Sequence, residues 1–514
     1  MKFINGKTLA GCIVSAYENL NDKKDEVNEL NVFPVPDGDT GTNMTMTIKS
    51  AANKVTALSN KTIIDVSKAL GQGSLMGARG NSGVILSQLC RGVSKSLKGK
   101  EKISAFEIRD CFLEAKKTAY KAVMKPTEGT ILTVCRKMAE ASEQYYEDDI
   151  EIDKYLYRIL LEGKKALKET PKLLPVLKEA NVVDAGGQGL IYLLEGAVKY
   201  LNEKIEDEFE YSDSDIENYD FSLNAICVNY KDDLRDDLED FCLIDRFEDN
   251  KYLSLEIKTH DIEQAISILF DKAQIVKLDL NKDDFEYEEK LEQENLKEMG
   301  IVAVSKGAGF DQVFKSLNTD YLISGGQTMN PSTEDINNAV EKVNAKNIFI
   351  LPNNKNIIMA AKQVEQLSDK NIYVLETKSI PQGFCALLAY DQELSVEENF
   401  ENMKEAMQEV TVCEITYSIR DTKVGNLDIK KDDIIGLISG QIKVNGKDID
   451  NVLLKTVETA MVDDVSLITL YYGDQVKKED AEKIKNKLSQ KFEDCDVELV
   501  DGGQPLYYYS ISLE

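Results

Sequence analysis

One short segment combines two acidic residues with residues that would shape a ligand-binding loop. Residues 31–44 read NVFPVPDGDTGTNM, in which Asp37 and Asp39 stand two positions apart. The prolines before them fix φ, and the glycines beside and after them permit tight turns. Carboxylate oxygens suit Mg²⁺, which takes its other ligands from water and nucleotide phosphates. The segment therefore predicts a cation site, and the alternative is an ordinary turn that joins two helices.

A second polar segment, GARGNSG at residues 77–83, directly precedes the apolar helical pattern Val84–Leu97. Glycines at the start of a helix let backbone N–H groups approach an anion, and the helix dipole favours negative charge there. The segment indicates a phosphate cradle, with a simple helix cap as the alternative. It is not a Walker A loop, because G-x-x-x-x-G-K-[ST] occurs nowhere in the chain.

Two further polar segments have the same character. EGT at residues 128–130 and VVDAGGQG at residues 182–189 each precede a pattern that predicts a helix. Four glycine-bearing loops, each before a helix and in one part of the chain, favour a shared ligand site over four independent caps.

These four segments resemble the DhaL-like ATP-binding domain of dihydroxyacetone kinases. The resemblance covers nearly the full length and is greatest to the catalytic subunits of bacterial fatty acid kinases, through SGGQTMNPST (324–333), NIFILPNNKN (347–356) and KSIPQG (378–383). It implies an N-terminal eight-helix barrel that binds ATP with two Mg²⁺ ions. It also implies a C-terminal fold like that of the DegV-like fatty-acid-binding proteins.

The resemblance also implies roles for particular residues. Asp37 and Asp39 would hold the metal ions; relatives supply a third aspartate upstream, where this chain offers Asn31. Arg79 would join the two aspartates in catalysis, although its alternative role is a surface salt bridge. The residues expected to line the nucleotide pocket are Thr40, Thr42, Asn43, Gly80, Asn81, Ser82, Thr130, Gly186 and Gly187.

The implied reaction transfers a phosphoryl group from ATP to the carboxyl group of a fatty acid, which a separate DegV-like binding protein carries, and gives an acyl phosphate. A carboxylate is already ionised at pH 7, so no general base is needed. The single histidine in the chain, His260, agrees with this expectation. The enzyme would instead offset the repulsion between an anionic nucleophile and the γ-phosphoryl group, through metal ions, helix N-termini and a cation such as Arg79.

Two other functions stay open. One is a kinase of a small hydroxyl compound, but dihydroxyacetone kinases capture their substrate with a histidine whose context His260 lacks. The other is a scaffold that binds nucleotide or the lipid-carrying protein without catalysis. Relatives also carry a cysteine and a His-x-His pair in the middle of the chain. Here Cys227 has no such pair, so we expect packing or dimerisation there in place of metal binding.

The elements that position these segments predict a multidomain protein. Apolar residues recur at helical spacing through residues 1–201, which predicts an all-α domain. The acidic residues 202–220 predict a linker, and short β-rich runs predict a small α+β module over 221–297. From residue 298 to 514, buried runs alternate with helices, which is typical of βαβ units over a parallel sheet.

Within this α/β region, TVCEITYSI and VSLITLYYG predict two more strands of similar type, while SGGQTMNPST is either an anion nest or a turn capped by Ser332 or Thr333.

Composition sets the broad limits. The chain has 514 residues, which predicts two or three domains, and its net charge of -29 argues against nucleic-acid binding. Residues 1–200 carry a net charge of +4 and the remainder -33, so the acidic part is either a solubilising surface or a face that docks a basic partner or repels anions. Nine cysteines without a CxxC pair and no apolar run long enough for a membrane predict a cytoplasmic protein. The family implies a homodimer.

Overall fold

The structure is a computed structural model. It describes residues 1–31, 38–123, 125–206, 221–228, 242–249, 252–259, 266–270, 274–282, 296–326 and 329–514. The chain divides into two compact units, one formed by residues 1–208 with 295–514 and the other by residues 209–294. Asp37 and His260 lie outside the described residues.

The first part of the chain is helical, as predicted, and we call it the helical lobe. Its helices are α1 (Gly6–Asp22), α2 (Lys24–Glu29), α3 (Thr40–Thr56), α4 (Ile63–Met76), α5 (Gly80–Ser96), α6 (Ala105–Ala122), α7 (Ile131–Gln144), α8 (Ile152–Leu173), α9 (Pro175–Ala180) and α10 (Ala185–Glu206). Helical structure thus continues past residue 201, where the acidic linker was expected to begin.

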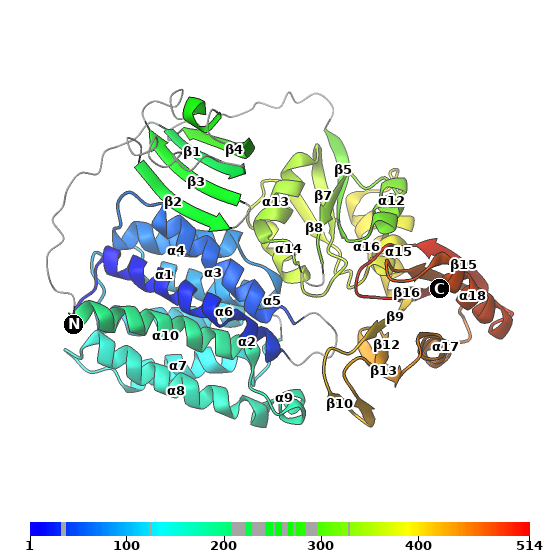
Figure 1. Ribbon diagram of the computed structural model, residues 1–514, viewed down its shortest axis with the longest axis horizontal. Coiled ribbons are helices and arrows are strands. Elements are labelled where there is room, and N and C mark those ends of the chain that lie inside the picture. The colour runs from blue at the N-terminus through cyan, green and yellow to red at the C-terminus, as the bar shows by residue number, and fades with distance from the viewer. Residues whose placement is uncertain are drawn as a thin grey trace. The chain divides into compact units, whose positions relative to one another are not determined.

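Amphipathic helices packed side by side form the helical lobe. The buried face of α1 carries Ile13, Ala16 and Leu20, at the spacing that one face of a helix requires. Small residues let the helices approach closely: a Cβ added at Gly196 of α10 would lie 2.4 Å from the Ser15 carbonyl oxygen of α1. Figure 1 shows α1, α8 and α10 running alongside one another.

The unit at residues 209–294 contains a four-stranded antiparallel sheet of order β2-β3-β1-β4. Its strands are β1 (Phe221–Val228), β2 (Cys242–Asp249), β3 (Tyr252–Thr259) and β4 (Gln274–Lys282). Residues 266–270 are helical. The predicted α+β character is confirmed.

The C-terminal part is α/β, and we call it the α/β lobe. It begins with β5 (Lys297–Ser305), α12 (Ala308–Ser316), β6 (Tyr321–Ser324), α13 (Thr333–Lys342), β7 (Ala345–Leu351), α14 (Ile358–Val364), β8 (Asn371–Val374), α15 (Ile380–Leu388) and α16 (Val396–Glu409). It continues with β9 (Thr411–Tyr417), β10 (Thr422–Val424), β11 (Leu427–Ile429), β12 (Ile434–Ile438), β13 (Gln441–Gly446), α17 (Ile449–Ala460), β14 (Leu467–Tyr472), α18 (Lys478–Lys491), β15 (Asp496–Asp501) and β16 (Tyr509–Leu513).

Two principal sheets build the α/β lobe. The parallel sheet has the order β6-β5-β7-β8, as the alternating runs predict. The runs TVCEITYSI and VSLITLYYG, however, form β9 and β14 of a separate six-stranded sheet of order β13-β12-β9-β16-β14-β15, in which only β14 and β15 pair in parallel. Both runs are therefore strands, as predicted, but they belong to a mainly antiparallel sheet, because apolar runs do not encode strand direction.

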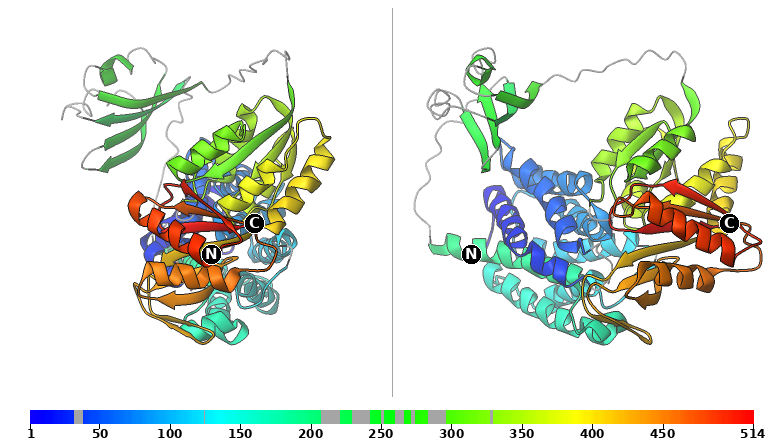
Figure 2. Two further views of the ribbon diagram at one scale, coloured as in Figure 1. Left: turned by 90° about the vertical axis from the view of Figure 1, so that its right-hand side faces the viewer. Right: turned by 45° about the vertical axis from the view of Figure 1, so that its right-hand side comes forward.

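Helices cover both faces of the parallel sheet. Successive residues of β5 point to opposite faces, so Val302 and Val304 pack with α13 and α14, whereas Ile301 and Ala303 pack with α12, α15 and α16. In the six-stranded sheet, α17 and α18 cover a common face and share one apolar core with β9 and β14. Figure 2 shows these two helices in orange and red.

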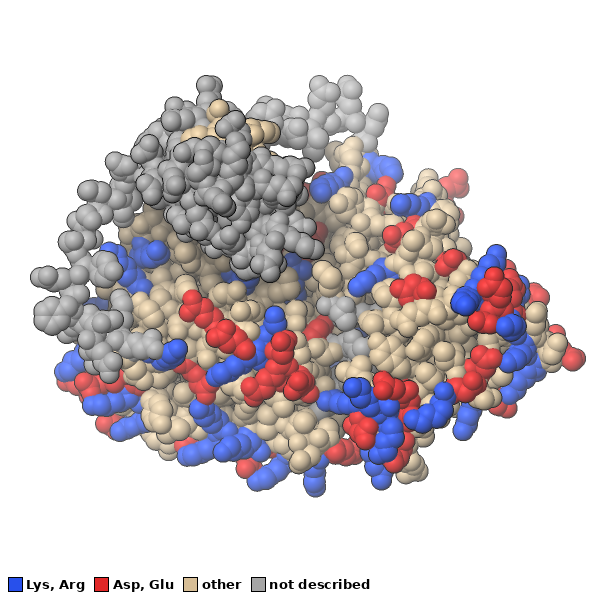
Figure 3. All heavy atoms as spheres, viewed as in Figure 1, with Lys and Arg blue, Asp and Glu red and all other residues tan. Residues whose placement is uncertain are grey.

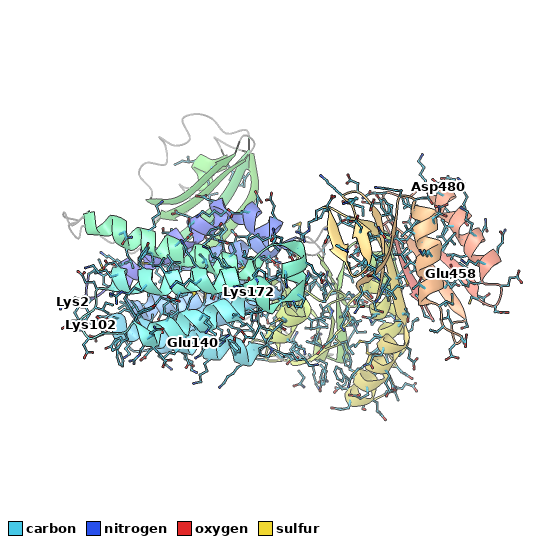
Figure 4. The ribbon with its side chains drawn as sticks, turned by 90° about the horizontal axis from the view of Figure 1, so that it is seen from below. Lys2, Lys102, Glu140, Lys172, Glu458 and Asp480 are labelled. Carbon is cyan, nitrogen blue, oxygen red and sulfur yellow. The ribbon has the colours of Figure 1, made fainter. Side chains whose placement is uncertain are left out.

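The surface carries both signs of charge. On the visible face, Lys and Arg are interspersed with Asp and Glu over both lobes (Figure 3). Exposed ion pairs account for several of the side chains labelled in Figure 4, such as Glu140 with Lys137 and Asp480 with Lys483. Such pairs contribute little to stability.

Among the described residues, no helix combines the length and apolar character that a membrane crossing requires.

Candidate functional site

The amino end of α3 places the second aspartate of the 31–44 segment. Asp39 is the N-cap residue of α3 and only 8% exposed, and its backbone carbonyl accepts from the Asn43 N–H at 2.8 Å. Thr40, the first residue of the helix, accepts from the Asn31 side-chain amide at 3.3 Å. The Thr40 hydroxyl lies 3.5 Å from that of Ser82, the third residue of α5. Four predicted site residues are thus brought together with Asn31.

The amino end of α5 lies against the same point. Gly80 begins this helix with φ of +56°, a conformation that glycine adopts without strain. A Cβ there would lie 2.4 Å from the Asn43 amide nitrogen. GARGNSG is therefore a helix start, as predicted, and its second glycine is required both by φ and by the proximity of α3. We call the junction of these two helix ends the α3–α5 corner.

A side chain from the α/β lobe completes the α3–α5 corner. Asn330 follows β6 and is 2% exposed. Its amide nitrogen donates to Asp39 Oδ2 at 2.6 Å and lies 3.5 Å from Asn43 Oδ1. Its own Oδ1 is buried and has no hydrogen-bond partner among the described residues.

The segment that carries Asn330 packs against the helical lobe through a group of polar and apolar contacts, which we call the seam. The Thr333 N–H donates to the Ala78 carbonyl at 3.0 Å, and the Thr333 hydroxyl donates to Gln363 at 2.9 Å. Gln363 in turn donates to Ser87 of α5 at 3.3 Å. Ala78 and Val84 are buried in one apolar cluster with α13 and α14. Both kinds of contact bind the two lobes together here.

Three of the predicted site residues in this region already contact other side chains or the backbone. The Arg79 guanidinium donates to the Asn330 carbonyl at 2.9 Å and pairs with Asp335 at 3.2 Å, the salt-bridge alternative raised above. The Asn81 side-chain nitrogen lies 3.5 Å from the side-chain oxygen of Asn356 in the α/β lobe. Thr42 is held by Asn28, which bonds both its hydroxyl and its backbone N–H at 3.1 Å.

The other predicted residues form a second cluster, the α7–α10 corner. Thr130 is the N-cap of α7, as the EGT segment predicts. The Asp184 carboxylate accepts from the Gly187 N–H at 2.7 Å and also from the backbone of Ile131. Burial of this carboxyl raises its pKa to about 6, although both hydrogen bonds act in the opposite direction.

Glycines at the start of α10 pack against other helices. A Cβ at Gly186 would lie 3.2 Å from that of Ile131 in α7, and a Cβ at Gly189 would lie 2.7 Å from the Met44 sulfur of α3. The amino ends of α3, α7 and α10 therefore lie at the same end of the helical lobe.

The donor set of the α3–α5 corner fits a hard cation. It contains the Asp39 carboxylate, the amides of Asn31 and Asn43 and the hydroxyls of Thr40 and Ser82, all oxygen-bearing groups of the kind that Mg²⁺ prefers. Within the described ranges, no three carboxylate, thiol or imidazole groups are close enough to hold a metal. Asp37, the other predicted ligand, lies outside those ranges.

Asn330 was not predicted as a site residue. Its segment SGGQTMNPST indicated only a family resemblance and either an anion nest or a capped turn. Ser332 is indeed the N-cap of α13, in a reciprocal capping box with Asp335. No feature of the neighbouring sequence indicates that Asn330 belongs to the site, because its partner Asp39 stands 291 residues away.

Two cavities lie apart from the α3–α5 corner. One of about 650 Å³ lies at the carboxyl ends of the parallel strands, where Gly325, Pro352 to Lys355 and Lys378 to Ile380 converge from the three resemblance segments. Such crevices commonly bind ligands in α/β folds. The other, of about 1230 Å³, is lined by α4, α5, α6 and α14 and contains several lysines.

Family models match two parts of the chain. The DAK2 domain matches residues 34–199, and the FakA-like C-terminal domain of fatty acid kinases matches residues 300–514. Full-length relatives are SAR1202 of Staphylococcus aureus (strain MRSA252), an uncharacterized protein, and Protein YloV of Bacillus subtilis (strain 168). Each is 36% identical, and the matches cover 99% and 100%, respectively, of both chains.

Solved structures show weaker similarity. The fatty acid kinase B3 protein of Streptococcus pneumoniae, loaded with linoleic acid, covers 42% of this chain and 99% of its own at 13% identity and a TM-score of 0.31. DegV of Bacillus subtilis, a fatty acid binding protein, covers the same shares at 13% identity and 0.33. The dihydroxyacetone kinase of C. freundii with AMP-PNP and Mg²⁺ covers 37% of this chain and 33% of its own at 16% identity and 0.30. Scores this low establish no common ligand.

Proposed function

Since the chain belongs to the FakA-like family of fatty acid kinases, we propose that it transfers the γ-phosphoryl group of ATP to the carboxyl group of a fatty acid and releases an acyl phosphate. The fatty acid is presented by a separate DegV-like binding protein that docks on the α/β lobe. A homodimer is part of the proposal, as the resemblance implies.

The observation that supports this function best is the convergence at the α3–α5 corner. One carboxylate, two hydroxyls and a glycine-initiated helix end meet there, and backbone N–H groups at a helix amino end attract phosphate. Asp37, Asp39 and Asn31 would hold Mg²⁺, which offsets negative charge on the phosphates. Thr40, Ser82 and the Gly80 N–H would orient the phosphate oxygens, and Asn43 and Asn81 would lie beside them.

The residues of this corner suit a carboxylate acceptor. An ionised carboxylate attacks phosphorus without losing a proton, so the site needs positioning and positive potential. Helix amino ends and Arg79 supply that potential, although Arg79 would first have to exchange the Asn330 carbonyl or Asp335 for a phosphate oxygen. Thr130, Gly186 and Gly187 belong to the α7–α10 corner at the same end of the lobe and would line the remainder of the nucleotide pocket.

ATP consumption by the purified full-length chain tests the proposal. We expect turnover only when a fatty-acid-loaded binding protein is added, with acyl phosphate trapped by hydroxylamine as the hydroxamate. Turnover with free dihydroxyacetone would support a kinase of small hydroxyl compounds instead. Nucleotide binding without turnover under either condition would support a scaffold.

A further inference from the structure

Asn330 is the residue through which the α/β lobe reaches the α3–α5 corner. It is almost completely buried, its amide nitrogen is 2.6 Å from Asp39 Oδ2, and its amide oxygen has no partner among the described residues. Buried polar atoms are nearly always hydrogen-bonded, so an exception beside a carboxylate indicates a place for a ligand or for water bound to it.

The position of Asn330 is fixed on both sides. Arg79 donates to its backbone carbonyl, and Thr333, three residues on, donates to the Ala78 carbonyl. Ser332 and Asp335 close the capping box that begins α13 immediately afterwards. An amide held by so many contacts is preorganised toward Asp39, which is the condition that a positioning residue must satisfy.

We propose that Asn330 is a positioning residue for the cation end of the nucleotide site and that this site is complete only when the α/β lobe is docked. This inference rests on the proposed function. The amide nitrogen orients the Asp39 carboxylate, and the amide oxygen accepts from a water of the hydrated cation. Groups that hold metal ligands in this way typically change metal affinity by about 10- to 100-fold when removed.

The proposal has a consequence for communication between the lobes. Docking of the Asn330 segment and uptake of Mg-nucleotide would be linked, so each would favour the other. A partner that displaces α13 or α14 from the seam would then weaken Mg-nucleotide binding without touching the nucleotide.

Calorimetric titration of the full-length chain with ATP at a series of Mg²⁺ concentrations tests this. We expect Asn330→Ala to raise the half-saturating Mg²⁺ concentration about tenfold. Asn330→Asp should lower it, because a second carboxylate beside Asp39 adds a charged ligand. The same substitution should lower the Tm without Mg²⁺, since like charges would face each other at hydrogen-bond distance.

Gln363→Leu is the matched control within the seam. Gln363 bonds Thr333 and Ser87 but does not contact Asp39. We expect a lower Tm and a much smaller change in the half-saturating Mg²⁺ concentration than Asn330→Ala produces, because loss of this one seam contact leaves the lobes docked and Asn330 beside Asp39. If Asn330→Ala leaves the Mg²⁺ dependence unchanged, or if Gln363→Leu shifts it equally, Asn330 is only a seam residue and the inference is overturned.

Hydrogen exchange gives a readout that needs no activity. Mg-ATP should slow exchange of the backbone amides of residues 329–335 in the wild type and should not do so in Asn330→Ala. Should Asn330→Asp fail to fold, these two proteins still decide the matter. Wild-type uptake of Mg-ATP with no response in 329–335 contradicts the inference alone, whereas no uptake by the wild type overturns the proposed function and the inference with it.

Discussion

The α3–α5 and α7–α10 corners resemble each other in sequence and differ in what they contact. Both are amino ends of helices, and both carry predicted nucleotide residues. At the α7–α10 corner, the Gly187 N–H is bonded by Asp184 of the same loop. At the α3–α5 corner, the contact comes from Asn330 in another lobe. When the residue directly before a helix accepts from the first N–H groups of that helix, the cap does not depend on the other lobe. When the contact comes from a distant segment, as it does from Asn330, a movement between the lobes can break it.

Removal of the central carboxylate of the α3–α5 corner should have the largest effect. We expect Asp39→Ala, and likewise Asp37→Ala, to lower turnover at least about 100-fold through lost electrostatic stabilisation. Circular dichroism should remain unchanged. Asp480→Ala, an exposed substitution on α18 (Figure 4), is the matched control and should leave turnover intact. Loss of fold in both aspartate variants would show that these carboxylates are structural.

The pH dependence of stability tests the role of Asp184 at the α7–α10 corner. The pKa of this carboxyl is raised in the folded protein, to about 6, so its contribution to stability is full below about pH 3.8 and is lost as the pH rises through about 6. Asp184→Asn has no such dependence. The free energy of unfolding of this variant minus that of the wild type should therefore rise between pH 4 and 7, by on the order of 2 kcal/mol.

Urea unfolding of both proteins over this pH range measures the difference. A constant difference across the range would mean that Asp184 is not the titrating group. Loss of Mg-ATP binding by Asp184→Asn, beyond its effect on stability, would show that Asp184 itself supports nucleotide binding and is more than a local helix cap.

Gly80→Ala tests the geometry of the α3–α5 corner. Its positive φ and the nearby Asn43 amide both oppose a side chain. We expect a loss of roughly 1–3 kcal/mol in stability and about tenfold weaker Mg-ATP binding from displacement of Asn43. Gly99→Ala is the control, because Gly99 also has positive φ but no neighbour within 4 Å of an added Cβ. Equal nucleotide affinity in the two variants would contradict a role for this contact.

Arg79→Lys should have the smallest effect. Lysine keeps the charge but loses the fork that contacts the Asn330 carbonyl and Asp335. Because the partly exposed pair with Asp335 contributes little, we expect only about threefold weaker Mg-ATP binding. Arg91→Lys is the control, because Arg91 lies toward the carboxyl end of α5, away from the α3–α5 corner. A loss of turnover above about 100-fold with unchanged nucleotide binding would assign Arg79 to the transferring phosphoryl group instead.

Local patterns predicted most of the elements. The helical spacing of apolar residues in the first part of the chain becomes the helices α1 to α10, and EGT becomes the start of α7. Glycine at position 80 marks a helix start because the backbone requires it. Ser332 caps α13 as one of the two residues expected to do so. Each of these signals depends on neighbours within a few residues.

The contacts between distant segments could not be predicted. Nothing around Asn330 indicates Asp39, and nothing in the runs of β9 and β14 indicates a second, mainly antiparallel sheet. The sequence also did not reveal that the Gly187 N–H is already bonded by Asp184. Such pairings depend on the tertiary arrangement, which the residue types at one position do not encode.

The seam has a practical consequence for any attempt to divide this protein into pieces. Ala78 and Val84 of the helical lobe belong to the apolar core beneath α13 and α14. A truncated chain that ends near residue 206 would present these side chains to water, and an isolated C-terminal fragment would expose the facing side of α13. Each fragment would then be prone to self-association, so affinities measured on truncated versions would understate those of the intact chain.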